Sequence, residues 1–311
     1  MPVSGSEPRI WLIAGPTASG KSALALKLAQ HVGGEILNAD ALQLYTDLPL
    51  LTARPSPSEE ALVPHHLFGK VDGADGWSVG HWLREATSRL NGASSPMIVV
   101  GGTGLYFKAL TEGLAEIPPI SPEVREASHR LYDQLGEQAF REGLAAVDVA
   151  AAGRIGPGDR QRLCRAWEVY SATGVSLTVW QARTDSSLDE GSWQAVLLEP
   201  PRHSLYGRCD ARLETMLEDG VLQEVAALTA RNLDPSLPIM KAVGYREFAA
   251  HLAGALTREE ALEAARQETR RYAKRQTTWA RGQMADWPRL SGISTQEQWG
   301  QFIALNPALT A

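Results

Sequence analysis

A glycine-rich stretch near the N-terminus decides the fold: Gly15-Pro16-Thr17-Ala18-Ser19-Gly20-Lys21-Ser22. An apolar run at 10–14 precedes it, and a leucine- and alanine-rich segment with helical spacing follows at 23–29. A strand, a glycine-rich turn and a helix in this order are the context in which G-x-x-x-x-G-K-[ST] binds phosphate. The backbone N–H groups and the helix N-terminus attract the anion, Lys21 reaches its outer oxygens, and the Ser22 hydroxyl can ligate Mg²⁺. We therefore expect this stretch to form a phosphate site.

Length and composition describe an ordinary globular protein. The chain has 311 residues, enough for two domains and a well-buried core, with 44% hydrophobic and 21% charged residues. No apolar run is long enough for a signal peptide or a transmembrane helix, so we expect a cytoplasmic protein with no membrane partner. The net charge of −6 argues against general coating of nucleic acid, although a local basic surface is compatible with it.

Two further segments with candidate site residues lie at the carboxyl ends of predicted strands. Residues 35–38 read as a short strand followed by Asp40, and the apolar residues 97–100 lead into the turn Gly101-Gly102-Thr103-Gly104. Ligands of open parallel sheets bind at the carboxyl ends of strands, so Asp40 and Thr103 are expected beside the phosphate loop. The three glycines would let a ligand approach the backbone and the Thr103 hydroxyl closely. The alternatives are that Asp40 caps the segment after it and that the glycines form only a tight turn.

Several other residues have structural and functional interpretations. The adjacent His65 and His66 suggest a metal site, but no third ligand of suitable spacing follows, so we favour structural histidines. The two cysteines, Cys164 and Cys209, show no metal-ligand spacing either and are expected to be reduced thiols.

The character of the sequence changes after residue 116. A proline-rich linker at 117–122 leads into segments with helical character at 123–135, 137–147 and 158–171, and an apolar strand returns only at 193–198. This pattern predicts an α/β fold, a P-loop NTPase-like parallel sheet flanked by helices, with a small all-helical insertion domain. We place the first part of the core at 1–116, the insertion at 117–190, and the second part of the core at 191–311.

Basic residues concentrate in three helical segments. Arg160, Arg162 and Arg165 lie close together in the insertion and predict either a phosphate-contacting face or a solvated one. Arg208 and Arg212 lie four residues apart within the helix-like segment 205–217, so one of them could point into the site. The segment 266–281, RQETRRYAKRQTTWAR, carries six basic residues against one acid, which predicts a nucleic-acid contact or else a charged surface helix with no partner.

Together these segments resemble the tRNA dimethylallyltransferase family, the bacterial tRNA isopentenyltransferases, collinearly from Trp11 to Gly282. A generic P-loop kinase has neither of the two late blocks, GYRE and AKRQTTW. The resemblance is carried by GPTASGKS, NADALQLY at 38–45, VPHHL at 63–67, GGTGLY at 101–106, DRQRLCRAWEVYSATG at 159–174, the block 205–225, AVGYRE at 242–247 and TRRYAKRQTTW at 269–279.

The resemblance implies transfer of the dimethylallyl group of dimethylallyl diphosphate to N6 of adenosine at tRNA position 37, giving N6-isopentenyladenosine and diphosphate. The tRNAs would be those that read codons beginning with U, with A at positions 36 and 37, and the enzyme would act as a monomer. The phosphate loop then holds the donor's diphosphate rather than ATP. Asp40 would take the N6 proton. The leaving diphosphate would be stabilised by Lys21, Ser22 through Mg²⁺, Thr103, and Arg208, with Arg212 ranked second.

The same resemblance implies a set of tRNA contacts, in which Gln43 reads the adenine edge. Three departures from the family pattern, Ala41 in place of Ser, Thr46 in place of Arg, and a glycine missing from the loop 51–55, put the finer contacts of 41–55 in doubt. The implied contacts are Asp40, Ala41, Leu42, Gln43, Thr103, Arg125, Gln161, Arg162, Leu163, Arg165, Lys241, Gly244, Tyr245, Arg246, Arg271, Lys274, Arg275 and Gln276.

Three other functions fit parts of the chain. A small-molecule kinase using ATP would explain only the N-terminal third. An RNA-binding module with a vestigial nucleotide site would explain the basic segment but not Asp40. A prenyltransferase acting on free AMP would need neither the insertion nor the segment 266–281. The residues after Gly282 show no pattern that predicts a role.

Overall fold

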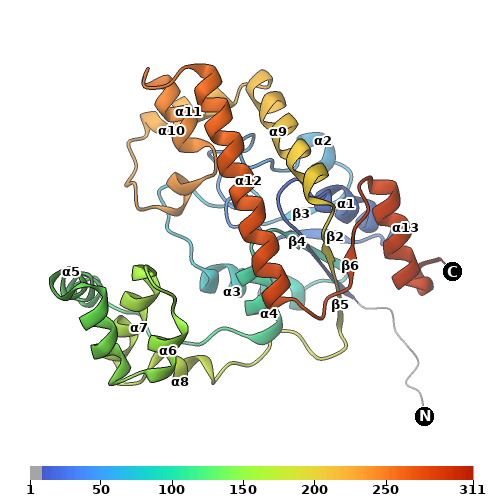
Figure 1. Ribbon diagram of the computed structural model, residues 1–311. Coiled ribbons are helices and arrows are strands. Elements are labelled where there is room, and N and C mark those ends of the chain that lie inside the picture. Colours follow the sequence, from blue (N-terminus) through green and yellow to red (C-terminus); the bar gives the residue numbers. More distant parts are fainter. Residues whose placement is uncertain (1–8, 311) are drawn as a thin grey trace, which may run out of the picture. The chain divides into compact units, whose positions relative to one another are not determined.

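A six-stranded, all-parallel sheet forms the centre of the computed structural model, which describes residues 9–310 (Figure 1). The strand order is β3-β2-β4-β1-β5-β6. The strands are β1 (Ile10–Ala14), β2 (Glu35–Asn38), β3 (His65–His66), β4 (Met97–Gly101), β5 (Trp193–Leu198) and β6 (Arg289–Leu290). The predicted parallel sheet is therefore confirmed, and the turn after β4 lies beside the loop after β1, as expected.

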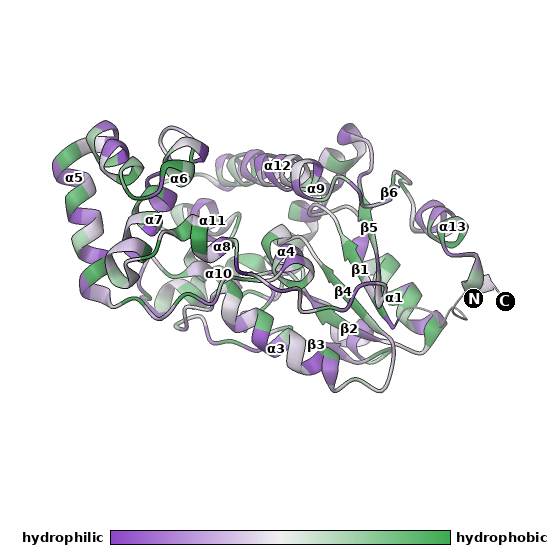
Figure 2. Ribbon diagram, turned by 90° about the horizontal axis from the view of Figure 1, so that it is seen from below, coloured by the Kyte–Doolittle hydropathy of each residue, from purple (hydrophilic) through white to green (hydrophobic). Residues whose placement is uncertain are grey.

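Helices cover both faces of this sheet, which explains why its central strands are continuous apolar runs. Alternate residues of β1 point to opposite faces: Leu12 packs with Trp82 and Phe107 in one core, and Ile13 packs with Leu24 and Phe302 in the other. The central strands β1, β4 and β5 accordingly appear hydrophobic in Figure 2. The helices outside the insertion are α1 (Lys21–Val32), α2 (Pro57–Glu60), α3 (Val79–Asn91), α4 (Gly104–Glu112), α9 (Arg202–Glu218), α10 (Val221–Ala230), α11 (Tyr245–Leu252), α12 (Arg258–Gln283) and α13 (Thr295–Leu305), with 3₁₀ turns η1 (Pro238–Lys241) and η2 (Pro307–Thr310).

The chain divides into two compact units, one formed by residues 1–110 with 188–311 and the other by 111–187; the sequence analysis placed the insertion at 117–190. The second unit contains α5 (Pro122–Ala145), α6 (Val149–Arg154), α7 (Arg160–Thr173) and α8 (Leu177–Gln181), and none of its described residues forms a strand. Helix α5 is interrupted at Gly136, whose φ of 74° is left-handed, between the two helices expected there. Phe140, Leu144 and Leu163 form the centre of a separate core.

The sequence did not predict the structure of the segment after Gly282. Strand β6 adds the last strand to the sheet beside β5, and α13 packs against α1 (Figure 1). Phe302 is buried in the core that α1 covers, and His31 of α1 contacts the carbonyl oxygen of Leu309 at 2.7 Å. The residues after Gly282 therefore extend the sheet by one strand and cover part of the core beside α1.

Strand β3 explains the two adjacent histidines. Nε2 of His66 lies 2.6 Å from the Glu35 carboxylate of the neighbouring strand, and Nδ1 of His65 contacts the carbonyl of Val63. Within residues 9–310 no group of three or more His, Cys, Asp or Glu side chains could hold a metal ion. Both imidazole rings thus contact neighbouring protein groups, as the structural interpretation expects. In the same part of the chain, no helix is both long and apolar enough to cross a membrane.

Candidate active site

The phosphate loop joins β1 to α1 and requires left-handed backbone at two positions. Ala18 and Gly20 both have left-handed φ angles, 60° and 95°, and the N–H of Gly15 donates to the carbonyl of Gly101 at 3.3 Å. Nζ of Lys21 donates to the carbonyl of Pro16 at 3.2 Å, which folds the side chain back over the loop. Burial lowers the pKa of Lys21 to about 8, and the nearby Asp40 carboxylate opposes that shift.

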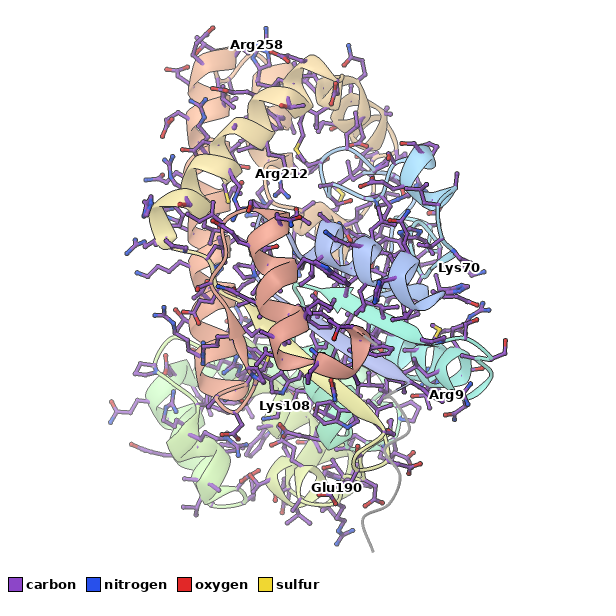
Figure 3. The ribbon with its side chains drawn as sticks, turned by 90° about the vertical axis from the view of Figure 1, so that its right-hand side faces the viewer. Arg9, Lys70, Lys108, Glu190, Arg212 and Arg258 are labelled. Carbon is purple, nitrogen blue, oxygen red and sulfur yellow. The ribbon has the colours of Figure 1, made fainter. Side chains whose placement is uncertain are left out.

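Arg212, rather than Arg208, lies against the phosphate loop. Nη2 of Arg212 donates to the Thr17 hydroxyl at 2.5 Å, and Figure 3 shows Arg212 projecting from α9. Arg208 lies one helical turn before Arg212 on α9. Its Nη1 donates to the carbonyl of Ile293, which is outside the phosphate loop. Of the two arginines, Arg212, which the sequence ranked second, is thus the one whose guanidinium contacts the phosphate loop.

Both arginines keep buried donors without a partner. Nε of Arg212, and Nε and Nη2 of Arg208, are buried and make no hydrogen bond within residues 9–310. Burial lowers the pKa of both guanidinium groups, and Asp40 contributes an opposing effect at Arg212. Buried charged donors without partners are costly, so the unpartnered Nε of Arg212 beside the phosphate loop favours an anionic ligand there.

Asp40 is fixed in the loop that follows β2 by its neighbours. The buried Asn38 side chain bonds both the N–H and the carbonyl of Asp40, and the Thr103 hydroxyl accepts the N–H of Ala41 at 2.9 Å. Oδ1 of Asp40 accepts the N–H of Leu42, so the capping interpretation is realised too. Oδ2 makes no hydrogen bond within residues 9–310. One carboxylate oxygen thus shapes the turn while the other stays available.

The three glycines of the turn after β4 make room for the protein itself rather than for a ligand. A Cβ atom on Gly101 would lie 2.1 Å from the backbone of Ala39, and one on Gly102 would lie 2.3 Å from the side chain of Gln276. A Cβ on Gly104 would lie 2.1 Å from the ring of Trp279. The expectation that these glycines let a ligand approach is replaced by this tight packing, which brings α12 onto the turn.

Gln276 connects the phosphate loop to that turn, a role that the sequence analysis did not predict. Its Oε1 accepts the N–H of Thr17 at 2.8 Å, and its Nε2 donates to the carbonyl of Gly102 at 3.0 Å. The motif AKRQTTW suggested an RNA contact, but a motif alone does not reveal which way a helical side chain points. Gln276 instead faces the phosphate loop and the turn after β4.

Helix α12 uses part of its basic surface to pack on α9, which lies along it in Figure 1. Arg266 pairs with Glu214 and Arg270 with Asp210, both on α9, so these two arginines hold the helices together. Arg271 and Arg275 are 61% and 58% exposed and share Glu268 on their own helix. Lys274 is also exposed. The outward basic face is thus the trio Arg271, Lys274 and Arg275.

Some residues in the expected tRNA set have buried side chains. Leu163 is fully buried in the core of the second unit, and its N–H is already bonded to Asp159. Gly244 is buried with a φ of 91° at the start of α11, and Tyr245 packs in the main core with its hydroxyl 3.2 Å from Thr229. The side chains of Leu163 and Tyr245 are therefore packed inside the protein rather than presented to a ligand, and Gly244 has no side chain. Lys241 and Arg246, on either side of them, are exposed.

The side chain of Gln43 is hydrogen-bonded to a nearby loop of the protein. Its Nε2 donates to the carbonyls of Thr52 and Ala53, so both amide hydrogens hold the loop 51–55 in place. Only Oε1 is left to read an adenine edge, which narrows the expected role to accepting one hydrogen bond. Ala41 and Leu42 are partly buried beside it.

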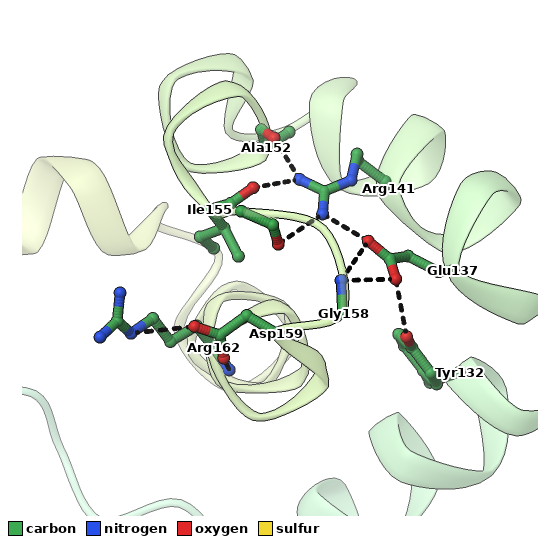
Figure 4. A network of polar contacts seen from close by, with 9 residues as sticks. Tyr132, Glu137, Arg141, Ala152, Ile155, Gly158, Asp159 and Arg162 are labelled. Atoms are coloured by element: carbon green, nitrogen blue, oxygen red, sulfur yellow. Dashed lines mark hydrogen bonds and ion pairs between the residues drawn. The ribbon is translucent and has the colours of Figure 1, made fainter. Parts of the chain in front are cut away.

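The arginines of the second unit combine structural pairs with exposed surface. Arg141 bonds the carbonyls of Ala152, Ile155 and Gly156 and pairs with Glu137, which also accepts the N–H of Gly158 (Figure 4). This network fixes the loop that leads into α7. The other expected tRNA contacts on that helix, besides the buried Leu163, are exposed or partly so: Arg162 pairs with Asp159, Arg165 pairs with Glu168, and Gln161 is exposed, as is Arg125 on α5.

A parallel sheet with a phosphate loop after β1 and a fixed carboxylate after β2 defines the P-loop NTPase-like class. Within it, the profile of the IPP transferase family matches residues 43–283, and that of the isopentenyl transferase family matches residues 8–63. The chain belongs to the IPP transferase family. The resemblance to tRNA dimethylallyltransferases is thereby confirmed.

Individual relatives match this chain over nearly its whole length. The tRNA dimethylallyltransferase of Phenylobacterium zucineum is 62% identical over 307 residues, covering 98% of this chain and 99% of the relative. That of Caulobacter sp. strain K31 is 59% identical, covering 93% and 94%. Among solved structures, a eukaryotic dimethylallyltransferase acting on tRNA matches with a TM-score of 0.82 at 26% identity, covering 97% of this chain and 79% of that one. The tRNA isopentenylpyrophosphate transferase of Bacillus halodurans matches with a TM-score of 0.68 at 28% identity, covering 97% of both.

Proposed function

We propose that this protein transfers the dimethylallyl group of dimethylallyl diphosphate to N6 of adenosine 37 in tRNA. The observation that carries the proposal is the grouping of one carboxylate, Asp40, with the partly buried cations Lys21 and Arg212 beside the phosphate loop. The cations suit a diphosphate leaving group, and the carboxylate suits proton removal from the attacking nitrogen. Relatives named tRNA dimethylallyltransferase support the reaction class.

The chemical step needs both kinds of group. The N6 lone pair forms a bond to C1 of the dimethylallyl group while the bond from C1 to the diphosphate oxygen breaks. The exocyclic nitrogen of adenine is a poor nucleophile, so its proton passes to the Asp40 carboxylate, whose Oδ2 is not engaged by the protein. The charge that develops on the diphosphate is stabilised by loop N–H groups, Lys21 and Arg212, already oriented before reaction.

Magnesium is part of the proposal, and its fit rests on the donor set. Ser22 is the second residue of α1 and its side chain is exposed at the phosphate loop. Mg²⁺ in phosphate sites is held by one or two protein oxygens with substrate phosphates and water, so one hydroxyl is an adequate protein contribution. The ion would neutralise diphosphate charge. Thr103, expected to act on the substrate, already has its hydroxyl engaged by Ala41 and fits a role in holding the Asp40 loop.

The acceptor, adenosine 37 of tRNA, has fewer contacts assigned to it in this proposal than the donor has. A base stacked in an RNA loop cannot reach a diphosphate bound in a protein site, so adenosine 37 would be flipped out of its stack. Each unit presents exposed basic residues for the RNA backbone, Arg271, Lys274 and Arg275 on α12 and Arg162 on α7. A requirement for A at positions 36 and 37, a monomeric state and a cytoplasmic location remain predictions from the family.

An acceptor and donor comparison tests the proposal. The protein would be incubated with Mg²⁺, dimethylallyl diphosphate and an anticodon stem-loop carrying A at positions 36 and 37, and the nucleosides analysed by mass. We expect N6-dimethylallyladenosine from this stem-loop, none when position 37 is G, and little from free AMP. Transfer to AMP at the stem-loop's rate favours the free-nucleotide enzyme. Transfer or hydrolysis of ATP without prenylation favours the kinase.

A further inference from the structure

We infer that α13 belongs to the donor site and that Gln298 is a positioning residue that orients the phosphate loop. Residues 284–311 lie outside the span that the family profiles match, which ends at 283. The inference rests on the proposed function, because it assigns Gln298 a part in binding the donor's diphosphate.

The Gln298 side chain is fully buried against the loop. Its Nε2 donates to the carbonyl of Ser19 at 2.8 Å and to that of Gly292 at 2.9 Å. Ser19 is also fully buried, and a Cβ atom on Gly20 would lie 2.8 Å from Oε1 of Gln298. The amide therefore packs where the loop turns into α1, and a buried carbonyl at that point needs such a donor.

Peptide geometry carries this contact to the ligand side of the loop. The carbonyl of Ser19 and the N–H of Gly20 belong to one peptide group, and no peptide bond within residues 9–310 is cis. In a planar trans peptide these two groups point in opposite directions. Because Gln298 holds the Ser19 oxygen on the α13 side, the Gly20 N–H is directed away from α13. Loop N–H groups of this kind are the ones that bind phosphate.

The turn before α13 reaches a second part of the same site. Gly292, whose carbonyl binds Gln298, is followed by Ile293, whose carbonyl accepts Nη1 of Arg208 at 3.1 Å. The N–H of Gly292 donates to Oε1 of Gln301 on α13. One short turn thus connects the loop, Arg208 and α13. Gln298 touches the loop directly, whereas Gln301 touches only the turn.

That difference supplies a matched pair of variants. Gln298→Met keeps the length of the side chain and removes both hydrogen bonds, and Gln301→Met does the same one turn along α13. We would measure binding of inorganic diphosphate and of dimethylallyl diphosphate, each with Mg²⁺, and of the stem-loop. Loss of one or two buried hydrogen bonds predicts that Gln298→Met weakens both diphosphates roughly fivefold to tenfold. Stem-loop affinity should change less than twofold, and Gln301→Met should leave all three affinities near the wild-type values.

Equal diphosphate affinity in Gln298→Met and the wild type overturns the inference, as does an equal loss in Gln301→Met. A wild-type protein that binds neither diphosphate contradicts the proposed function instead. Should Gln298→Met fail to fold, hydrogen exchange of the wild type decides: bound diphosphate should slow exchange of the Gln298 N–H, which donates to Ser294 within α13. Unchanged exchange there overturns the inference.

Discussion

Thr17 and Gln276 are 259 residues apart in the sequence, and the backbone N–H of Thr17 donates to Oε1 of Gln276 at 2.8 Å. The other end of the same amide bonds Gly102. The helix that presents Arg271, Lys274 and Arg275 to solvent on one face therefore holds the phosphate loop and the Asp40-supporting turn with another. One helix thus carries both the exposed basic trio and the amide that holds the phosphate loop.

Gln276→Met should separate these two faces. The change removes both hydrogen bonds at similar volume, so we expect the KM for dimethylallyl diphosphate to rise roughly tenfold. The affinity for the stem-loop should stay within a factor of two, because Gln276 faces the loops. Steady-state kinetics and a filter-binding titration provide the two numbers. A loss confined to stem-loop binding would support the RNA contact that the motif suggested.

Arg212→Lys and Arg208→Lys test which arginine serves the diphosphate. Lysine keeps the charge but cannot reproduce the guanidinium's geometry, and only Arg212 contacts the loop. We expect kcat/KM for the donor to fall by about 100-fold in Arg212→Lys, the value of a strong charged hydrogen bond, and by about tenfold or less in Arg208→Lys. The opposite order in a kinetic comparison at saturating stem-loop would restore the ranking made from sequence.

The lowered pKa of Lys21 predicts a pH dependence of donor binding. With a pKa of about 8 caused by burial, the free site loses its Lys21 charge as pH rises through that value. A bound diphosphate favours the charged form, so binding above pH 8 takes up a proton and affinity falls with rising pH. Calorimetry at pH 8.5 in buffers of different ionisation enthalpy measures the uptake. Lys21→Arg, which stays charged, should show none; equal uptake in both proteins contradicts the assignment.

The outward basic face of α12 should set the salt dependence of tRNA binding. Replacing both Arg271 and Arg275 by Gln removes two exposed charges, and each lost phosphate contact lowers the slope of log K against log salt by about 0.7 to 0.9. We expect weaker stem-loop binding and a slope smaller by one to two such steps, with donor affinity unchanged. Arg125→Gln, exposed on α5, tests the second unit in the same way. An unchanged slope in the double variant means that this face does not touch RNA.

Much of the architecture was predictable from residues with strong local signals. The phosphate loop, the strands at 35–38, 97–101 and 193–198, and the helical insertion each have a composition that few other structures share. Strand β6 has two residues, and α13 begins after a polar, irregular stretch, so neither produces a periodic pattern. Their positions depend on packing against α1 and β5, which are distant in sequence.

The site was harder to predict than the fold, because residue type does not reveal direction. Arg208 and Arg212 share a motif, but only the structure shows which one reaches Thr17. Arg266 and Arg270 look like RNA contacts in sequence and instead pair with Glu214 and Asp210. The glycines after β4 suggested a ligand, whereas Gln276 and Trp279 occupy the space beside them. Each of these outcomes depends on a partner at least fifty residues away.

The central claim is that Asp40 takes the N6 proton while the phosphate loop holds the leaving diphosphate, and Asp40→Asn tests it most directly. An asparagine oxygen can still accept the N–H of Leu42, so the turn should survive while the base is lost. The measurement is the single-turnover rate of adenosine prenylation with saturating stem-loop and donor, alongside both binding constants. We expect a rate at least 100-fold lower, the usual effect of losing a general base, with both affinities within twofold of the wild type. A variant that transfers at the wild-type rate, or that loses binding in proportion to turnover, would contradict this claim.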